Sequence, residues 1–236
     1  MERQAVKIKN IPAILWGPAS DFLYIAVHGD QSHKEDDAIV IFAEEAVYKG
    51  YQVLSFDLPE HGARKEEPRL CKVQNCVADL HAVMEYAHTL SDRISLFGCS
   101  IGAYFSMLAY REEPIRQTLF LSPVVDMKRI IQNMMTWFDV SEERLEKEQE
   151  IATPVKTLYW DYYQYVLAHP VQWDKPTALL YGEKDNLCEI GYVKAFADHA
   201  HADLMIMEDG EHFFHTEEQL AYLRRWLKRK IEEKMR

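Results

Sequence analysis

Residues 94–102 read ISLFGCSIG, and this stretch decides the fold of the 236-residue chain. An apolar run over residues 94–97 passes directly into G-C-S-I-G, which fits the pattern G-x-S-x-G, and a helical pattern follows at once. A turn this sharp needs glycine two positions before and after the serine, because side chains there would collide. The stretch therefore predicts a strand, a tight turn that lifts Ser100 above the sheet edge, and a helix.

On both sides of this stretch, short apolar runs alternate with longer amphipathic ones. Strands are expected over residues 5–9, 13–16, 22–27, 52–56, 94–97, 118–121, 177–181 and 204–207. Helices are expected over residues 37–49, 71–90, 101–111, 190–201 and 217–230. Because such alternation builds βαβ units, we predict an α/β fold with a mostly parallel eight-stranded sheet and helices on both faces. The first two strands have no helix between them, so we expect an antiparallel hairpin at the sheet edge.

The alternation fails once, between Asp126 and Lys175. This segment holds an acidic helical stretch over residues 141–150 and an aromatic-rich one over residues 158–167, with no clear strand. Pro170 and Pro176 close it, since proline ends helices and favours extended chain. We therefore expect a single domain over residues 1–236, in which residues 126–175 form a small helical cap inserted into the sheet domain.

Two downstream loops carry the side chains that a serine nucleophile needs. A serine hydroxyl reacts poorly near neutral pH unless a base accepts its proton, and the base needs a carboxylate to fix its tautomer. Asp185 and His212 each follow an expected strand, so both fall at the edge where an open parallel sheet places its active site. The order Ser, Asp, His along the chain is also the expected one. We predict Ser100, Asp185 and His212 as the catalytic residues.

Other residues remain open for the acid and the base. His215 is the substitute for His212, because it lies one helical turn later. Asp126, at the end of the preceding strand, is the second candidate for the acid, and Glu183 is the third. The four cysteines match no zinc spacing, and His199 with His201 lacks further ligands at a recognisable spacing. We expect free thiols, no metal and no cofactor.

The loop after the strand expected at residues 22–27 reads HGDQ and contains a glycine. Its backbone can direct an N–H group at a developing oxyanion, beside the N–H of the residue that follows the nucleophile. We assign these two oxyanion-hole donors to Asp30 and Ile101. The Asp30 side chain must then face away, since a carboxylate aimed into the hole would oppose the charge being stabilised.

Charge and hydropathy exclude several other classes of protein. With 27 basic and 38 acidic side chains the formal net charge is −11, which disfavours binding to nucleic acid and to anionic membranes. No apolar run approaches the roughly 20 residues needed to span a bilayer, and the first residues, MERQ, lack the basic-then-apolar order of a signal peptide. We therefore expect a cytoplasmic protein that acts on a small molecule.

These motifs together resemble the α/β-hydrolase fold superfamily, close to its serine esterase and prolyl-oligopeptidase-like branches. The resemblance extends over nearly the whole chain and rests on residues 28–29, 34–35, 57–62, 98–102, 182–185 and 210–212. It implies Ser100 as nucleophile, Asp185 as acid, His212 as base, and the N–H groups of Asp30 and Ile101 as oxyanion hole. We predict a serine hydrolase that cleaves carboxylic esters of small to medium acyl groups through an acyl-enzyme. The alternatives are a small peptidase or amidase with the same triad and a binding protein that kept the fold and lost activity.

Overall fold

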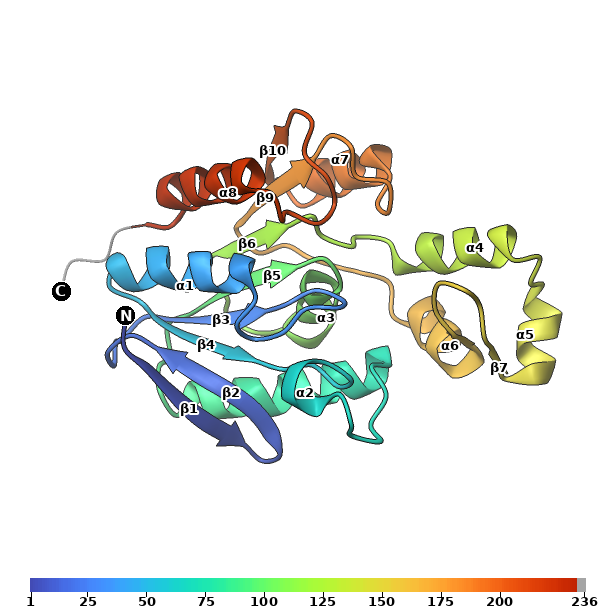
Figure 1. Cartoon of the computed structure of the whole chain (residues 1–236), viewed down its shortest axis with the longest axis horizontal. Helices are drawn as coiled ribbons and strands as arrows, with labels where there is room; N and C mark the ends of the chain where they lie inside the picture. The colour runs from blue at the N-terminus through green and yellow to red at the C-terminus, as the bar shows by residue number, and fades with distance from the viewer. Residues whose placement is uncertain (233–236) are drawn as a thin grey trace.

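The computed structural model describes residues 1–232, which form one eight-stranded sheet with helices on both faces (Figure 1). The strands of this sheet are β1 (Arg3–Ile8), β2 (Ile11–Trp16), β3 (Leu23–Val27), β4 (Gln52–Phe56), β5 (Ile94–Cys99), β6 (Thr118–Leu121), β9 (Thr177–Gly182) and β10 (Asp203–Met207). The helices outside the 126–175 segment are α1 (Asp37–Tyr48), α2 (Val73–His88), α3 (Ile101–Ala109), α7 (Ile190–His199) and α8 (Glu217–Lys230), with a short 3-10 turn at Gly62–Arg64.

The strand order in the sheet is β1-β2-β4-β3-β5-β6-β9-β10. β1 and β2 form an antiparallel hairpin at one edge, and β2 also pairs antiparallel with β4. The strands β4, β3, β5, β6, β9 and β10 run parallel to one another. The predicted fold class, a mostly parallel eight-stranded sheet with an antiparallel edge hairpin, is confirmed. Because the parallel strands share one direction, the ends of β5, β9 and β10 lie at the same edge of the sheet, and that edge holds the site.

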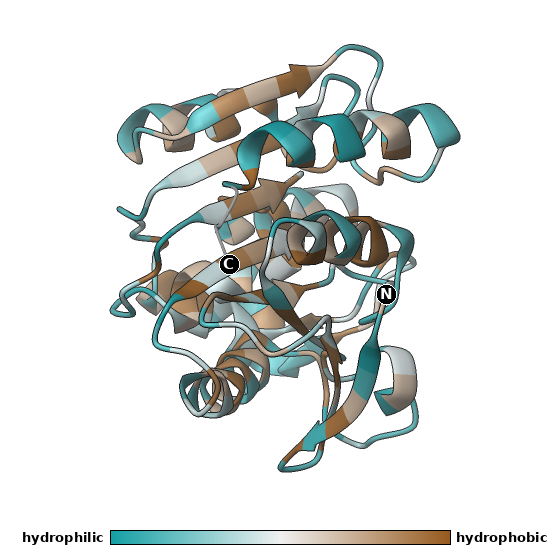
Figure 2. Cartoon of the chain, turned by 90° about the vertical axis from the view of Figure 1, so that its left-hand side faces the viewer, coloured by the Kyte–Doolittle hydropathy of each residue, from teal (hydrophilic) through white to brown (hydrophobic). Residues whose placement is uncertain are grey.

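Two layers of helices bury the two faces of the sheet. α1 and α8 cover one face, where Phe42 stacks on Phe97 with ring centroids 4.1 Å apart and Trp226 is fully buried. α2, α3 and α7 cover the other face. The strands are largely apolar, whereas much of the outer helix surface is hydrophilic (Figure 2). β3 is buried along its whole length, as a central parallel strand should be. In the described part of the chain, no helix is both long and apolar enough to cross a bilayer.

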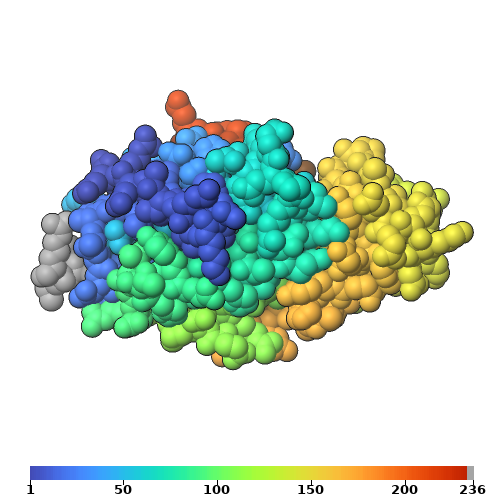
Figure 3. Space-filling view, turned by 90° about the horizontal axis from the view of Figure 1, so that it is seen from below, coloured from blue at the N-terminus to red at the C-terminus, as the bar shows by residue number. Residues whose placement is uncertain are grey.

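The segment between β6 and β9 forms a separate group of elements beside the sheet. It contains α4 (Met127–Trp137), α5 (Glu142–Glu148), β7 (Glu150–Ile151), β8 (Leu158–Tyr159) and α6 (Trp160–Ala168). These elements lie at one end of the molecule, beyond the strand ends and next to α2 (Figures 1 and 3). We call residues 126–175 the cap.

The structure of the cap differs from the sequence expectation in two ways. The expectation of no strand is wrong, because β7 and β8 pair antiparallel, with Ile151 opposite Leu158. The pair is only two residues long, and a run that short carries no periodicity that a sequence pattern could reveal. The sequence also did not single out α4 as a helix, although it is strongly amphipathic and begins at an N-cap formed by the Asp126 side chain.

Candidate active site

Ser100 lies at the tip of a sharp turn between β5 and α3. Its backbone has φ 50° and ψ −118°, a conformation that non-glycine residues rarely adopt. The surrounding chain holds it there. The Ser100 N–H donates to the carbonyl of Leu121 at 3.0 Å, and the Ser100 carbonyl accepts from the N–H of Val124 at 3.2 Å. Local strain of this kind persists only when the neighbouring structure over-determines it, and here it fixes the position of the side-chain hydroxyl.

The two glycines of the turn are required by close neighbours. A Cβ atom on Gly98 would lie 2.9 Å from the Cα of Ala103, at the start of α3. A Cβ on Gly102 would lie 2.3 Å from the carbonyl oxygen of His28, at the end of β3. The first contact arises within the turn, as expected from the sequence. The second arises because α3 packs directly on a neighbouring strand, so Gly102 is needed for helix-sheet packing as well.

Ser100, His212 and Asp185 form one hydrogen-bonded chain. The Ser100 Oγ lies 2.8 Å from Nε2 of His212, and Nδ1 of His212 lies 2.6 Å from Oδ2 of Asp185. The other carboxylate oxygen of Asp185, Oδ1, accepts the N–H groups of Leu187 and Cys188, each at 2.9 Å. The Asp185 side chain is fully buried and the His212 ring is mostly buried. Asp185 thus holds Nδ1 protonated, which leaves Nε2 free to accept a proton from Ser100.

Close backbone packing brings the Asp185 and His212 loops together. The N–H of Lys184 donates to the carbonyl of Gly210 at 2.7 Å, and the N–H of Glu183 donates to Met207 at 2.9 Å. A Cβ on Gly182 would lie only 2.4 Å from the carbonyl oxygen of Glu211. The two loops therefore touch along their main chains, and side-chain flexibility contributes little to the placement of the acid and the base.

The alternative acids and base have other partners. Oδ1 of Asp126 accepts the N–H of Arg129 at 2.9 Å and caps α4. Glu183 accepts the N–H of Asp209 at 3.1 Å. His215 directs Nδ1 at the carbonyl of Phe213, 2.7 Å away, and its ring stacks on the ring of Phe213. The structure therefore brings Asp185 and His212 to Ser100, and it engages the three substitutes elsewhere.

The loop after β3 packs directly against Ser100. A Cβ on Gly29 would lie 3.2 Å from the Cβ of Ser100. His28 is fully buried behind the loop, where Nδ1–H donates to the Gly29 carbonyl at 2.7 Å and Nε2 accepts the N–H of Leu58 at 3.0 Å. Both contacts suit a neutral ring, and burial lowers the pKa of His28 to about 4. His28 thus fixes the loop that carries Asp30, one of the two expected oxyanion-hole residues.

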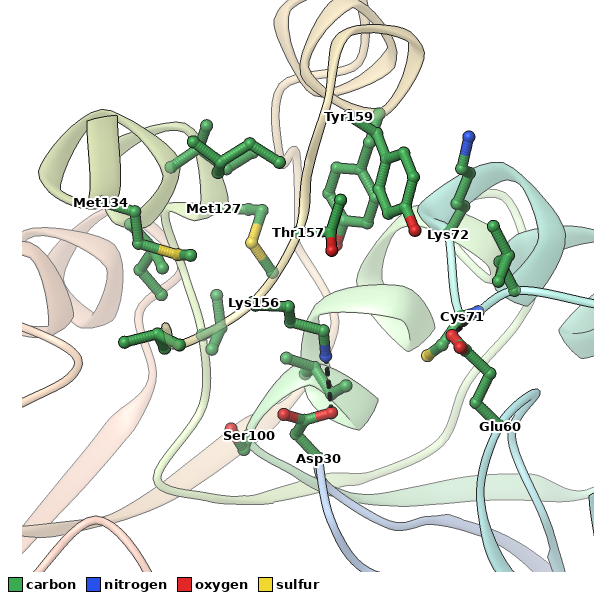
Figure 4. A pocket seen from close by; sticks show the side chains of 18 of the residues that line it. Asp30, Glu60, Cys71, Lys72, Ser100, Met127, Met134, Lys156, Thr157 and Tyr159 are labelled. Carbon is green, nitrogen blue, oxygen red and sulfur yellow. Dashed lines mark hydrogen bonds and ion pairs between the residues drawn. The ribbon is translucent and has the colours of Figure 1, made fainter. Parts of the chain in front are cut away.

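The Asp30 carboxylate lies in the same pocket as Ser100. We expected it to face away from the oxyanion; it points toward the cap, but it still lines the same pocket as Ser100 (Figure 4). Its Oδ1 accepts from Nζ of Lys156 at 2.7 Å and lies 3.2 Å from Nε2 of His61. Although burial favours the neutral acid, these two partners hold the pKa of Asp30 well below its usual value. The cations offset a charge that would otherwise oppose an oxyanion beside Ser100.

The ring of His61 can adopt either protonation state without moving. Its Nδ1 lies 2.7 Å from the Pro59 carbonyl and donates to it. Nε2 faces both the Asp30 carboxylate and the N–H of Gln31, which lies 3.1 Å away. A protonated Nε2 donates to Asp30, and a neutral one accepts from Gln31. Burial opposes protonation, but the hydrogen bond to Asp30 outweighs it and raises the pKa of His61.

A pocket of about 260 Å³ opens between Ser100 and the cap (Figure 4). Its inner end contains Ser100, Ile101 and Asp30 from the sheet domain. Its roof and walls are mostly apolar and come largely from the cap, with a contribution from α3 and the following loops; they include Phe105, Val124, Met127, Ile130, Ile131, Met134, Val155, Leu158, Tyr159 and Tyr162. The cap thus bounds an apolar space directly beside Ser100.

A second cavity, of about 370 Å³, lies on the other side of Ser100. His212, Phe213 and Phe214 line it together with Cys99 and the loop that carries Asp30. Ser100 borders both cavities. A substrate carbonyl at Ser100 can therefore extend one substituent under the cap and the other past His212.

A group of possible metal ligands lies in the site. Ligand atoms of Asp185, Cys188 and His212 are all within 4.8 Å of one another. The His212 Nδ1 and Asp185 already share a proton in a 2.6 Å contact, and burial raises the pKa of the Cys188 thiol, which keeps it neutral. Because a metal needs deprotonated thiolate and a free imidazole nitrogen, these residues fit the serine hydrogen-bond chain better than a metal.

Lys156 and Cys71 are among the polar residues of the pocket that were not identified from the sequence. Lys156 approaches Asp30 from a position 126 residues later in the chain, and only the path of the cap brings them together. Cys71, just before α2, lines the pocket 3.5 Å from Cys76, although the sequence indicated only that both are free thiols. The spacing of five residues between Cys71 and Cys76 was the one available signal for this pair.

The sequence matches a known family over most of its length. A model of the prolyl oligopeptidase family matches residues 65–234, a range that includes Ser100, Asp185 and His212. No curated protein matches the sequence.

Solved structures share the fold at low sequence identity. Est1E from Butyrivibrio proteoclasticus, in a structure with ferulic acid bound, is 21% identical with a TM-score of 0.80, and 96% of each chain is covered. Mouse alpha/beta hydrolase domain-containing protein 10 is 14% identical with a TM-score of 0.75, over 96% of this chain and 97% of that one. The Pyrococcus furiosus esterase PF2001 is 21% identical with a TM-score of 0.66, over 98% and 92%. These likenesses show the α/β-hydrolase fold, as the sequence predicted.

Proposed function

Since the chain belongs to the prolyl oligopeptidase family, we propose that it is a serine hydrolase that cleaves carboxylic esters of small to medium acyl groups. One observation carries the proposal: Ser100, His212 and Asp185 form a continuous hydrogen-bonded chain, and Ser100 lies at the inner end of an apolar pocket. A serine in a strained turn, an imidazole within hydrogen-bond reach and a buried carboxylate are the three parts that acyl transfer needs.

The reaction uses each member of this chain in turn. Ser100 Oγ attacks the ester carbonyl while Nε2 of His212 takes its proton, and Asp185 stabilises the imidazolium that forms. Collapse of the tetrahedral intermediate breaks the bond to the alcohol, which receives the proton from His212 and leaves an acyl-enzyme on Ser100. A water molecule then attacks the acyl carbonyl while His212 takes its proton. The bond to Ser100 Oγ breaks, the acid is released, and His212 returns the proton to Ser100.

The oxyanion of each tetrahedral intermediate needs hydrogen-bond donors already in place. The N–H of Ile101, the first residue of α3, has no partner within its own helix because the first N–H groups of a helix lack one. We assign this group and the N–H of Asp30 as the two donors. Lys156, paired with the Asp30 carboxylate, keeps that side chain from opposing the oxyanion.

The two cavities beside Ser100 can bind the acyl and alcohol parts of the ester separately. The apolar pocket under the cap suits the acyl chain, because every buried CH₂ contributes about 0.8 kcal/mol. The cavity beside His212 suits the leaving alcohol, because His212 must reach the alcohol oxygen to protonate it. Est1E, which shares the fold, was solved with ferulic acid, so an aromatic acyl group belongs in the substrate screen.

An amide substrate is the second candidate function, and the family match favours it. The same three residues serve amides, and Glu60 and Asp30 bring carboxylates to the pocket, where a free substrate amine could bind. The Asp30 carboxylate already forms an ion pair with Lys156, however, and the Glu60 carboxylate accepts the N–H of Cys71 at 2.5 Å. Esters are therefore the better match to a pocket with this apolar lining.

The test is covalent labelling with a fluorophosphonate, which loses fluoride as it phosphonylates an activated serine. We expect labelling of Ser100 in the wild type and its loss in Ser100→Ala, together with a fall in ester kcat/KM of at least about 10⁴-fold. Ala also carries a Cβ, so the backbone strain is unchanged and the melting temperature should move little. Retained labelling of Ser100→Ala would refute the nucleophile.

A substrate screen separates the three possible functions. p-Nitrophenyl esters and aminoacyl p-nitroanilides are compared by kcat/KM at equal enzyme concentration. Higher values for the esters support the esterase, and higher values for the anilides identify a peptidase or amidase. A wild-type protein that neither labels nor hydrolyses would be a binding protein on this fold.

A further inference from the structure

Two cysteine thiols face each other in the wall of the pocket under the cap. Cys71 immediately precedes Lys72, the N-cap of α2, and Cys76 lies in the first turn of that helix. Their Sγ atoms are 3.5 Å apart. A disulfide bond is about 2.05 Å long, so the two sulfurs need to approach by only about 1.5 Å to form one.

The two thiols differ in their access to small molecules. Cys71 lines the pocket that also holds Ser100, and Figure 4 shows it beside Glu60 at the pocket wall. Cys76 is fully buried behind it. A small solute that enters the pocket therefore meets the sulfur of Cys71 first, and Cys76 can react only through Cys71.

The pKa values of the two thiols also differ, in opposite directions from that of a free cysteine. The hydrogen bond from the Cys76 thiol outweighs the effect of burial and, with a contact to His61, lowers the pKa of Cys71 to about 6. Burial and the neighbouring Cys71 raise the pKa of Cys76. Since the thiolate is the nucleophile, Cys71 is the reactive sulfur near neutral pH and Cys76 is its protonated partner.

We propose that Cys71 and Cys76 are a reversible modification site for hydroperoxides, at which Cys71 is oxidised and Cys76 closes a disulfide in the pocket wall. Redox-sensing thiols combine a low-pKa cysteine that solutes can reach with a second cysteine that can resolve it, and Cys71, although largely buried, is reached through the pocket that it lines. All four cysteines are free thiols in the structure.

The chemistry takes two steps and needs only hydrogen peroxide or an organic hydroperoxide as oxidant. The Cys71 thiolate attacks one peroxide oxygen, the O–O bond breaks, and Cys71 becomes a sulfenic acid while hydroxide or alkoxide leaves. The Cys76 thiol then gives up its proton, its sulfur attacks Sγ of Cys71, the S–O bond breaks and water leaves. In total two thiols and one hydrogen peroxide give one disulfide and two waters.

The disulfide also alters the pocket, and this consequence rests on the proposed esterase function. Oxidation removes the thiolate charge from the wall and draws Cys71 toward α2 and away from His61. A neutral, slightly wider wall accepts an apolar acyl chain more readily, because no charged group must be desolvated beside it. We expect the ratio of kcat/KM for the p-nitrophenyl octanoate to the acetate to rise at least threefold on oxidation.

The experiment is mass spectrometry of the intact, fully reduced protein treated with one equivalent of hydrogen peroxide at pH 7. We expect the loss of two hydrogens, a cross-link between the peptides of Cys71 and Cys76, and complete reversal by dithiothreitol. Cys99 and Cys188 are internal controls, because burial raises the pKa of both thiols. Oxidation of either control before Cys71, or a Cys71 sulfinic acid without a cross-link, would overturn the proposal.

Variants of each cysteine test which one is oxidised by the peroxide and which one closes the disulfide. In Cys76→Ser the sulfenic acid has no resolving thiol, so dimedone should trap it at Cys71. In Cys71→Ser, or Cys71→Ala if the serine variant is unstable, Cys76 should resist the same peroxide dose by at least tenfold. Melting temperatures identify any variant that does not fold. Trapping at Cys76 in Cys71→Ser, with the fold intact, would reverse the assignment.

A Ser100→Ala background separates this inference from the proposed function. The disulfide should form there at the wild-type rate, because the thiol chemistry does not use the serine. If the disulfide forms and the octanoate-to-acetate ratio stays constant in the active enzyme, the coupling to the pocket is refuted. If Ser100 proves unreactive, the cross-link alone still decides the modification site.

Discussion

The strand-end loops that carry Asp185 and His212 are held by a different kind of interaction from the cap that covers the pocket. Main-chain hydrogen bonds and glycine contacts fix the loops of Asp185 and His212 against each other. The cap meets the sheet domain through an apolar interface and through side-chain ion pairs, such as Lys156 with Asp30 and Lys72 with Asp161. Partly exposed pairs of this kind stabilise a protein by about 0–1 kcal/mol each.

Because of this difference, substitutions in the loops and substitutions in the cap should affect different properties of the enzyme, namely its rate and its substrate selectivity. Changes in the loops should act on the rate for every substrate, because they alter the groups that move the proton. Changes in the cap should act on which substrates are accepted, because they alter the shape and charge of the pocket. The largest effect of a substitution is therefore expected in the loops.

Asp185→Asn should lower kcat/KM by about 10³–10⁴-fold for all esters, since an amide in place of the carboxylate favours the wrong tautomer of His212. Asp126→Asn is the matched control at the border of the cap. It should change kcat/KM less than threefold, because Asp126 caps α4 and Asn is an equally good N-cap. His212→Ala should cost about as much as loss of Ser100, because the members act as a unit. An inactive Asp126→Asn beside a nearly normal Asp185→Asn would transfer the acid role to Asp126.

The neutral, buried His28 should make the loop region sensitive to acid. Its pKa falls from 6.5 to about 4 on folding, because burial disfavours the charged ring. A depressed folded pKa stabilises the fold above pH 6.5, and this contribution is lost as the pH falls through 4. By linkage it amounts to about 3 kcal/mol between pH 7 and pH 4.

The measurement is urea unfolding at pH 7 and pH 4. His28→Gln should be less stable at pH 7, but its free energy of unfolding should fall by about 3 kcal/mol less than that of the wild type over this range. Carboxylates titrate in both proteins, so the difference between the two slopes isolates His28. Equal slopes would mean that the ring is already charged in the folded protein.

The sequence was sufficient to predict the sheet, and to predict that the side chains of Ser100, Asp185 and His212 meet at its edge, because both depend on local patterns. Gly98 and Gly102 flank Ser100 at positions where a sharp turn between a strand and a helix has no room for a side chain. The order of the strands then places Asp185 and His212 beside that turn. Gly182 and Gly210, which bring the two loops together, are plain in the sequence, although their role as contact points appears only in three dimensions.

The cap was less predictable for a physical reason. β7 and β8 are too short to show a period, and the Lys156–Asp30 pair depends on the path of the chain through the whole cap. The orientation of the Asp30 carboxylate follows from that pair, so it could not be predicted from residues 28–31 alone. Contacts between an insertion and its host are long-range, and the hydrophobic pattern of either part does not encode them.

Filling the pocket should change selectivity with little effect on chemistry. For p-nitrophenyl esters from acetate to palmitate, kcat/KM should rise over the first few carbons and fall once the chain meets the cap, and a denatured protein should not be cleaved. Met134→Trp places a larger side chain in the pocket and should lower kcat/KM for the octanoate about tenfold while leaving the acetate within twofold. A maximum at palmitate, or cleavage of the protein, would show that the cap does not bound the pocket.

The smallest effect is expected at the ion pair that joins the cap to the loop that carries Asp30. Lys156→Met leaves the Asp30 carboxylate without its cap partner beside Ser100, so the oxyanion forms against a charge that is less fully compensated. We expect kcat/KM to fall about fivefold, or roughly 1 kcal/mol, for acetate and octanoate alike. Through this ion pair, the cap should affect the rate for all esters as well as the selectivity among them.

Two companion variants determine whether charge or cap attachment causes this loss. Asp30→Asn combined with Lys156→Met removes both charges and should restore kcat/KM to within twofold of the wild type, because the backbone N–H of residue 30 is retained. Lys72→Met breaks another ion pair between the cap and the sheet domain, the 2.8 Å pair with Asp161. It should leave the acetate rate within twofold of the wild type, since this pair does not include the loop that carries Asp30. If Lys72→Met slows the acetate as much as Lys156→Met does, and the double variant stays slow, attachment of the cap controls the rate and the charge of Asp30 does not.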